Sequence, residues 1–504
     1  MYIQLIHPPQ RISATNYVSA VAIPPLGLAY LASALEAAGH RVGVIDGVAG
    51  DFNHIERVQG QALRGEPFER IVEAVDPRAD LIGIGIMFSS SWPYLRELVR
   101  LLRKRWPNKM LVVGGEHATA LPEQVLNETS VDLCVVGEGE VTIVELCDRL
   151  QQGQPLDDLP GLVRRVGDRI VTHPPRERIR NIDDIPLPAW HHFDIEGYIA
   201  LRQPHGSADG RSMPILATRG CPYRCSFCSA SGTWTTRWIP RDPVRLVDEM
   251  ELYMHRYGVN DFHFEDLTAI VRKDWTLAFC NEILKRGLSI SWQMPAGTRS
   301  EAIDEAVARA MFAAGCRQFT YAIESGSPRV LERINKKIKI DNVFASARVA
   351  MRAGIRVQAA FIFGFPFETL RDLLRTYRTV LRCAVAGFHE INIAALAPLP
   401  NTPIFRELQS AGRLDMNDEY LDSIFGYMDF RNYRSWHPNI SDRGLRGMIL
   451  FTYASFFALS YVLRPRRLWR LLRGLSGAQT DGKLAKIIKG LRTNTRLLKT
   501  APTG

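Results

Sequence analysis

The chain has 504 residues, of which 46% are hydrophobic and 23% are charged, and its formal net charge is +10. A chain of this size and composition is expected to form a soluble protein of two or three domains. Its eight cysteines exclude a disulfide framework. The N-terminal run Met1–Pro9 lacks the positive segment of a signal peptide and predicts a strand, so we expect a reducing, cytoplasmic location.

Residues 1–150 alternate short apolar runs with amphipathic stretches, which predicts a parallel, doubly wound α/β sheet of Rossmann type. In such sheets a ligand lies at the carboxyl ends of the strands, where the strand order reverses. The predicted strands are Tyr2–Ile6, Val42–Ile45, Leu81–Met87, Met110–Val113 and Leu133–Val136. The predicted helices include Leu26–Ala38, Tyr94–Arg105 and Val141–Leu150.

Small and polar residues fill the loops after these strands, and glycines there let a bulky ligand approach the backbone. Each loop alone is weak evidence, because any α/β domain has glycine turns. Taken together the loops form a candidate ligand-binding edge. Its residues are Asp46, Ser89, Ser90, Gly114, Gly115, Glu116, His117, Gly137, Glu138 and Gly139.

Residues 151–212 are rich in proline, charge and turns. We expect an ordered connector here, because Trp190, Phe193 and Tyr198 would be costly to leave exposed; a flexible linker is the alternative. Residues 213–430 repeat strand–helix units and predict a partial TIM-type barrel of six βα units, with the active site on the loops after the strands. The predicted strands are Pro214–Thr218, Asp261–Phe264, Ser289–Gln293, Gln318–Ala322, Arg356–Phe363 and Glu390–Ala397.

The C-terminal segment, residues 431–504, is expected to be mainly helical and holds the positive charge. Between Arg464 and Gly504 there are eleven basic residues and one acidic residue, so the rest of the chain is nearly neutral. The uncharged run Met448–Leu463 is a little short for a bilayer span, and we expect a helix packed on the barrel. The basic segment Arg464–Arg473 is typical of an interfacial helix and predicts peripheral membrane contact. Nucleic-acid binding is not expected, since charge alone discriminates poorly.

Three cysteines, Cys221, Cys225 and Cys228, share a C-x3-C-x2-C spacing. Thiolates are soft ligands, and clustered cysteines favour an iron–sulfur or zinc site. A structural zinc site requires a fourth ligand nearby, yet the next cysteine, Cys280, is 52 residues further on. Three thiolates on a four-iron cluster leave one iron free to hold a small molecule.

This stretch, with the aromatic Phe227 before the last cysteine, resembles the signature of the radical S-adenosylmethionine (radical SAM) enzymes. The resemblance implies a [4Fe-4S] cluster whose open iron binds SAM and cleaves it to a 5′-deoxyadenosyl radical. It also implies SAM contacts from Phe227, from Glu265 or Asp266, after the second barrel strand, and from the pair Glu324 and Ser325. A helix-capping role is the alternative for the carboxylates at residues 265 and 266.

The first 150 residues resemble the cobalamin-binding domain of B12-dependent radical SAM enzymes. The start of the first helix, Pro24–Ala32, and the run Val136–Glu140 are similar to that subfamily. Val48 stands where many B12 proteins place a cobalt-ligating histidine, which implies cobalt without a histidine from that loop. We expect His117 to contact phosphate, ribose or water, with cobalt ligation as the alternative.

The resemblance implies a cobalamin-dependent radical SAM enzyme. In methylating relatives the adenosyl radical abstracts a substrate hydrogen and methylcobalamin delivers methyl to carbon. The substrate is expected to be a small, lipophilic metabolite, and the electron donor an external protein such as flavodoxin or ferredoxin. The alternative keeps both cofactors but catalyses cyclisation, ring contraction or oxygen insertion, as the anaerobic magnesium-protoporphyrin monomethyl ester cyclase does.

Two hypotheses from other functional classes agree less well with the sequence. A tRNA methylthiotransferase should carry a second cysteine triplet in its N-terminal domain, yet residues 1–133 contain no cysteine. A non-enzymatic cobalamin sensor would explain the first domain but not the cysteine loop. The remaining cysteines lie in apolar stretches and are expected to be buried and inert: Cys134, Cys147, Cys280, Cys316 and Cys383.

Overall fold

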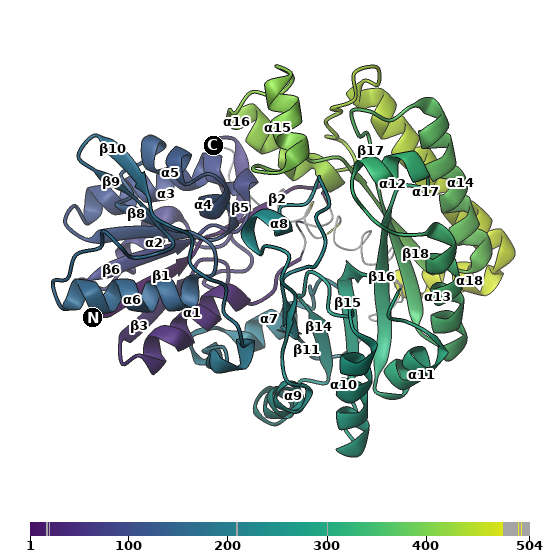
Figure 1. Cartoon of the computed structure of the whole chain (residues 1–504), viewed down its shortest axis with the longest axis horizontal. Helices are drawn as coiled ribbons and strands as arrows, with labels where there is room; N and C mark the ends of the chain where they lie inside the picture. The colour runs from purple at the N-terminus through teal and green to yellow at the C-terminus, as the bar shows by residue number, and fades with distance from the viewer. Residues whose placement is uncertain are drawn as a thin grey trace.

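A computed structural model describes residues 1–16, 19, 21–207, 210–299, 301–476, 492 and 495. Two α/β units lie side by side, an N-terminal unit and a larger barrel-like unit (Figure 1). The predicted helical segment 431–504 is described only in part, since most of its residues after 476 lie outside the described set.

The N-terminal unit is built on a seven-stranded sheet of order β10-β9-β8-β7-β6-β1-β3. Five strands are parallel, and their order changes direction at β1, so the doubly wound fold expected from the sequence is confirmed. The parallel strands are β1 (Tyr2–His7), β3 (Arg41–Asp46), β6 (Leu81–Gly85), β7 (Met110–Gly114) and β8 (Leu133–Val135). Helices around them are α1 (Leu26–Ala37), α2 (Phe68–Glu73), α3 (Trp92–Arg105), α4 (Glu116–Ala120), α5 (Pro122–Glu128) and α6 (Gly139–Gln151).

Two features of this unit differ from the sequence expectation. Strands β9 (Leu162–Val166) and β10 (Arg169–Thr172) belong to the segment that we expected to be a connector, but they extend the sheet with antiparallel strands. Their apolar residues Leu162 and Val163 are fully buried against the sheet. A small second sheet is formed by β2 (Gln10–Ile12), β5 (Gln61–Arg64) and β4 (Ile55–Val58).

The rest of the connector is ordered and packed, as expected. Trp190, Phe193 and Tyr198 are all buried, and the Trp190 indole donates to the Tyr253 hydroxyl at 2.8 Å. The segment holds the short helices η3 (Ile182–Asp184), η4 (Trp190–His192) and α7 (Ile195–Leu201). It runs along α1 of the first unit before it enters the barrel.

The second unit is a six-stranded parallel sheet of order β11-β14-β15-β16-β17-β18, which confirms the partial barrel. Each of the five described crossovers is covered by helices on the outer face (Figure 1). The strands are β11 (Ser212–Ile215), β14 (Asp261–Phe264), β15 (Ser291–Thr298), β16 (Cys316–Glu324), β17 (Arg356–Phe363) and β18 (Glu390–Ala395). The helices are α9 (Pro243–Tyr257), α10 (Lys273–Lys285), α11 (Glu305–Ala313), α12 (Pro328–Arg333), α13 (Ile340–Ala353) and α14 (Leu370–Ala386).

The chain after the barrel returns to the first unit. Helix α15 (Pro403–Ser410) follows β18, and α16 (Asp418–Phe425) packs on α3 and on η2 (Ser89–Ser91) of the N-terminal unit. Ion pairs at 3.0 Å or less join Asp418 to Arg96 and Asp422 to Arg11. The C-terminal segment therefore bridges both units.

The final described helices are α17 (Asp442–Leu463) and α18 (Pro465–Ser476). One face of α17 packs on α14 and β18, as expected for a helix packed on the barrel, and the Tyr453 hydroxyl accepts from the Ile393 N–H of β18 at 2.7 Å. By length and composition α17 is also apolar enough to cross a membrane. Only 28% of its most apolar 18-residue stretch is buried. An apolar helix face therefore remains exposed.

Candidate active site at the junction of the two units

The cysteine loop lies between β12 (Thr218–Arg219) and α8 (Ala230–Thr233), shortly after the first barrel strand. Gly220 opens the loop with a φ of +83°, and a Cβ at this position would lie 2.2 Å from the Arg237 carbonyl oxygen. Only glycine can make this turn without moving the backbone. The sequence Arg-Gly-Cys therefore aims the loop toward the centre of the molecule.

Contacts from three other elements hold the loop in place. The Ser226 N–H donates to the Ile334 carbonyl at 3.0 Å, and the Ser226 carbonyl accepts from the Ile404 N–H at 3.1 Å. The Arg299 guanidinium lies 3.7 Å from the centroid of the Tyr223 ring, where a cation–π contact forms. The loop is thus held by the end of α12, by α15 and by the residue that follows β15.

The three motif cysteines are half-buried free thiols that lie close to one another. Burial raises the pKa of Cys228 to about 11, and the charges of Cys225 and Cys221 add to this rise. Burial also raises the pKa of Cys225. Three thiols that repel one another as thiolates are a suitable donor set for a positively charged iron centre, so these residues fit a three-cysteine iron–sulfur site.

A buried ion pair lies beside the cysteines. Glu324, the last residue of β16, accepts from Lys336 Nζ at 2.8 Å, and both side chains are only 8% exposed. Burial lowers the pKa of Lys336, but the Glu324 carboxylate more than offsets it and holds this pKa above its usual value. Lys336 Nζ also lies 6.0 Å from the Phe227 ring centroid, so the pair links the strand end to the cysteine loop.

The two carboxylates after β14 have different surroundings. Asp266 is buried and accepts from the Ala217 N–H at 3.1 Å and from the Thr218 hydroxyl at 2.6 Å, so it shapes the turn before the cysteine loop. Glu265 bonds His205 Nδ1 at 2.6 Å through Oε2, while its Oε1 is buried and has no partner among the described residues. Of the two carboxylates, only Glu265 has an oxygen without a described hydrogen-bond partner, and this oxygen can accept a bond from a ligand.

Ser325, the residue after Glu324, is fully buried. Its hydroxyl lies 3.1 Å from the Thr376 hydroxyl and accepts from the Ser327 N–H at 3.2 Å. These bonds form the turn that follows β16. Ser325 therefore supports the position of Glu324 through the backbone.

Large apolar side chains are exposed at the ligand edge of the N-terminal sheet. Met87 is 58% exposed and Phe88 is 67% exposed, directly after β6 and before η2. Two adjacent exposed apolar side chains at this edge form a surface on which an apolar ligand can pack. Ser89 and Ser90, the first residues of η2, are buried beneath this edge.

The neighbouring loops of this edge carry an open turn and an unpaired carboxylate oxygen. Gly137 has a φ of +79°, and a Cβ there would meet no atom within 4 Å, so its turn faces open space. Glu116 accepts from the Thr233 hydroxyl at 2.8 Å, while its Oε1 is buried without a described partner. Because Thr233 ends α8, this bond joins the edge to the cysteine loop. The edge fits a large, partly apolar ligand such as a corrin.

Four buried charges join the two units at the start of the cysteine loop. Arg219 pairs with Glu138 at 3.2 Å and with Glu140 at 2.5 Å, and Arg178 pairs with Glu138 at 2.8 Å. All four side chains are less than 9% exposed. Burial alone would raise the pKa of Glu140, but Arg219 outweighs it and holds this pKa below its usual value. We name these four residues the junction cluster.

Comparison with known proteins identifies both units. The B12 binding domain model matches residues 13–147, and the radical SAM superfamily model matches residues 215–380. The chain is 32% identical over 472 residues to an uncharacterized methyltransferase of Pyrococcus horikoshii, a match that covers 92% of this chain and 93% of that protein. This chain is a member of the cobalamin-dependent radical SAM enzyme family.

Further relatives of the enzyme are named for different activities. It is 26% identical over 427 residues to the cytidylyl-2-hydroxyethylphosphonate methyltransferase of Streptomyces wedmorensis, covering 78% of this chain and 79% of that protein. It is also 26% identical over 477 residues to the anaerobic magnesium-protoporphyrin IX monomethyl ester cyclase of a Synechocystis species, covering 94% and 88%.

Two solved structures share the fold of this cobalamin-dependent radical SAM enzyme. The methyltransferase TsrM from Kitasatospora setae superposes with a TM-score of 0.67 at 18% identity and covers 99% of this chain and 100% of that chain. The enzyme OxsB gives a TM-score of 0.69 at 17% identity and covers 99% and 80%. The family membership means that the cofactors are a [4Fe-4S] cluster, SAM and cobalamin.

Three residues expected at the cofactor sites use their side chains for hydrogen bonds or ion pairs within the protein. Asp46 is bonded by His7 at 2.8 Å and by the Tyr198 hydroxyl at 2.9 Å, so it anchors the end of β3. Glu138 belongs to the junction cluster, and Asp266 belongs to the turn at Thr218. Their carboxylates hold the protein together at the edges of the sites.

His117 has surroundings that differ from the expectation of a loop histidine touching phosphate, ribose or water. Its ring is fully buried, lies 4.9 Å from the Trp92 ring centroid, and has no described partner for either nitrogen. Burial, together with Arg96, lowers the pKa of His117 to about 3, so the ring is neutral. It is a buried residue of α4 that packs against Trp92 of α3.

Sequence reasoning missed several residues that the fold brings to the site. Arg219 was visible next to the first cysteine but carried no sign of its partners, 79 and 81 residues away. Lys336 lies in a charged turn of the kind that is usually exposed. Met87 and Phe88 end an apolar run, which predicted strand interior rather than an exposed edge.

Proposed function

We propose that this enzyme methylates an unactivated carbon of a small, lipophilic metabolite. The observation that carries the proposal is the junction itself: the loop with three free thiols meets the exposed apolar edge of the B12-binding unit at the bond between Thr233 and Glu116. The methyltransferase names of the relatives from Pyrococcus and Streptomyces support methyl transfer.

Each cofactor has a proposed set of residues. Cys221, Cys225 and Cys228 hold the cluster, while Glu265 accepts the SAM ammonium group through its unpaired oxygen. Phe227 and the Glu324–Lys336 pair line the SAM side of the loop. Cobalamin is held over Met87 and Phe88 by the backbone of the neighbouring loops, with these contributors: Ser89, Ser90, Gly114, Gly115, Glu116, Gly137 and Gly139.

The bound cofactors supply an adenosyl radical that removes a substrate hydrogen and a methyl group that replaces it. The chain's own residues keep the two cofactors in fixed relation and exclude water. The buried junction cluster and the Glu324–Lys336 pair do this through ion pairs in which each charge has a partner of opposite sign. An external donor such as flavodoxin or ferredoxin supplies the electron.

The test of this function is to follow the methyl group of isotopically labelled SAM. Anaerobically reconstituted enzyme is incubated with cobalamin, a reductant and extract from a strain that lacks the gene. Transfer of the label to a new product, with 5′-deoxyadenosine formed alongside, supports the proposal. A product without label supports the second candidate, a cyclase-type reaction, which rests on the similarity over 94% of this chain to the magnesium-protoporphyrin cyclase.

Glu265→Gln is expected to raise the KM for SAM about 10- to 100-fold, because it removes a charged acceptor from the ammonium group. The fold should change little, since glutamine keeps one oxygen for the bond to His205 and Oε1 has no partner among the described residues. Asp266→Asn is the matched control: it disturbs the turn at Thr218 and should lower Tm more than it changes KM. A normal KM in the Glu265 variant would remove this residue from the SAM site.

Phe88→Ala is expected to weaken cobalamin binding about 10-fold or more, because a buried phenylalanine side chain contributes about 1.5–3 kcal/mol. Absorbance of cobalamin retained after dialysis measures the loss. Phe312→Ala, on the exposed outer side of α11, serves as the control and should change nothing. Equal cobalamin retention in both variants would contradict the proposed corrin surface.

Membrane contact by the C-terminal helices is part of the proposal and would place the enzyme in the cytoplasm at a lipid surface. The exposed apolar residues include Phe451 and Val462 of α17 and Trp469 of α18. Residues 443–476 contain seven arginines and no acidic residue. An apolar face beside basic residues is complementary to anionic lipid.

The enzyme is therefore expected to sediment with phosphatidylglycerol vesicles but not with phosphatidylcholine vesicles. The double change Phe451→Glu and Trp469→Ala should reduce this binding about 10-fold or more. Leu284→Glu, an exposed leucine on α10, is the control. Concentration-dependent dimers without vesicle binding would show instead that a second copy covers this face.

A further inference from the structure

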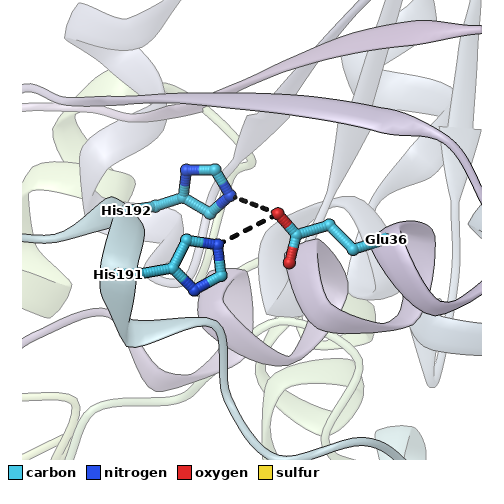
Figure 2. Close-up of side chains that lie close together, drawn as sticks. All are labelled: Glu36, His191 and His192. Carbon is cyan, nitrogen blue, oxygen red and sulfur yellow. Dashed lines mark hydrogen bonds and ion pairs between the residues drawn. The ribbon is translucent and has the colours of Figure 1, made fainter.

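Three potential metal ligands converge on the surface away from the cysteine loop. Glu36, near the end of α1, lies 3.1 Å from His191 Nε2 and 2.8 Å from His192 Nε2, and both distances are to the same oxygen, Oε1 (Figure 2). The two imidazole rings lie beside each other, with centroids 4.3 Å apart. The three ligand atoms are all within 4.8 Å of one another.

These distances are close to those of a formed site. In a tetrahedral zinc site with bonds of 2.0–2.1 Å, neighbouring ligand atoms are about 3.3 Å apart. The oxygen–nitrogen distances of 2.8 and 3.1 Å therefore require shifts of only about 0.5 Å or less. Two adjacent histidines on the rigid turn η4 present both nitrogens from one side, while the helix supplies the oxygen from the other.

The Glu36 carboxylate contacts both histidines through Oε1 alone. Its other oxygen makes no described hydrogen bond, so the carboxylate can turn toward an ion without losing a contact.

Two imidazole nitrogens and one carboxylate oxygen select the class of metal. Imidazole favours zinc, nickel, cobalt and copper, whereas magnesium and calcium prefer oxygen ligands alone. A fourth ligand has room, because Glu36 and His191 also line a surface pocket of about 450 Å³. The Tyr257 hydroxyl in the same pocket is buried and has no described partner.

We propose that Glu36, His191 and His192 bind a divalent transition-metal ion, zinc in the first place. The metal joins α1 of the B12-binding unit to the connector that leads into the barrel. Existing contacts already align these two segments: the Ala189 N–H donates to the Ala29 carbonyl at 2.9 Å, and the Ser33 hydroxyl donates to the Pro186 carbonyl at 3.2 Å. The ion adds a cross-link to this alignment and takes no part in the radical chemistry.

The test measures zinc binding to the holoenzyme. Anaerobically purified enzyme with intact cluster is passed over an immobilised chelator and dialysed to equilibrium against micromolar zinc. Zinc and iron per chain are then counted by mass spectrometry, and Tm is measured with and without zinc. The variants are His191→Gln with His192→Gln, Glu36→Gln alone, and the control His255→Gln, a histidine exposed on α9.

Wild type and the His255 control are expected to bind one zinc per chain at unchanged iron content, and zinc should raise their Tm. The double histidine variant should lose this zinc, and Glu36→Gln should bind it at least about 10-fold more weakly. Equal zinc in wild type and both variants, or no zinc in wild type, overturns the proposal. If the double variant does not fold, the Glu36 variant decides, since glutamine keeps the acceptor oxygen and the fold.

Discussion

Cys225→Ala is expected to give a folded protein that holds little iron after reconstitution and forms no 5′-deoxyadenosine. A cluster that keeps one iron open has only three protein ligands, so the loss of one thiolate leaves two and the cluster is released. Cys225 is half-buried, and its loop is held mainly by backbone bonds at Ser226, since the Cys225 thiol makes only a long contact of 3.9 Å to the Asn335 carbonyl. Iron and sulfide per chain, together with the absorbance of the cluster, measure the result.

The control for this change is another cysteine of the same unit. Cys280 is fully buried on α10, where burial raises the pKa of its thiol to about 12, so it is a neutral core residue. Cys280→Ala should lower Tm slightly and keep full iron content and turnover. If Cys225→Ala retained a complete cluster and normal SAM cleavage, the assignment of the loop would be wrong.

Arg219→Met is expected to destabilise the enzyme by about 3–5 kcal/mol, because it leaves the buried carboxylates of Glu138 and Glu140 without their shared cation. Denaturant unfolding of the variant, followed by fluorescence, measures the loss. Methyl transfer should fall more than 5′-deoxyadenosine formation, since the change loosens the B12-binding unit against the cysteine loop. The ratio of the two products reports this uncoupling.

A second change distinguishes the ion pair from mere packing. Adding Glu140→Gln to Arg219→Met removes one stranded charge and should recover part of the lost stability. In the wild-type enzyme the stability that Glu140 contributes depends on pH. Because the fold lowers the pKa of Glu140, this stability is present above the usual glutamate pKa and is lost as the pH falls through the lowered value. No recovery in the double variant would mean that volume, not charge, matters at residue 219.

Much of the architecture follows from local patterns. The five parallel strands of the first unit and the six of the barrel are apolar runs bounded by turns, so their positions could be predicted within a few residues. The cysteine spacing is local as well. The start of α14 is also local, since Thr369 caps this helix through a capping box with Asp372 three residues later.

The features that sequence could not supply depend on contacts between distant segments. Glu138 looked like part of a glycine-rich ligand loop, because the run around it gives no sign of Arg219 or Arg178. Strands β9 and β10 sit in a proline-rich stretch whose pairing is decided by the open edge of β8. Asp266 was expected to share the SAM contact with Glu265 because neighbouring carboxylates look equivalent in a sequence. They differ only once their hydrogen-bond partners are known.

The return of the chain after the barrel has a consequence for how the enzyme works through a catalytic cycle. Helix α16 rests on η2, the turn next to the exposed Met87 and Phe88, and its Asp418 and Asp422 are tethered to Arg96 and Arg11. The C-terminal segment therefore links the two units by contacts and ion pairs, in addition to the covalent connector. We expect substrate and the products of SAM cleavage to exchange while the two units stay in contact. A chain truncated before residue 418 should bind cobalamin more weakly.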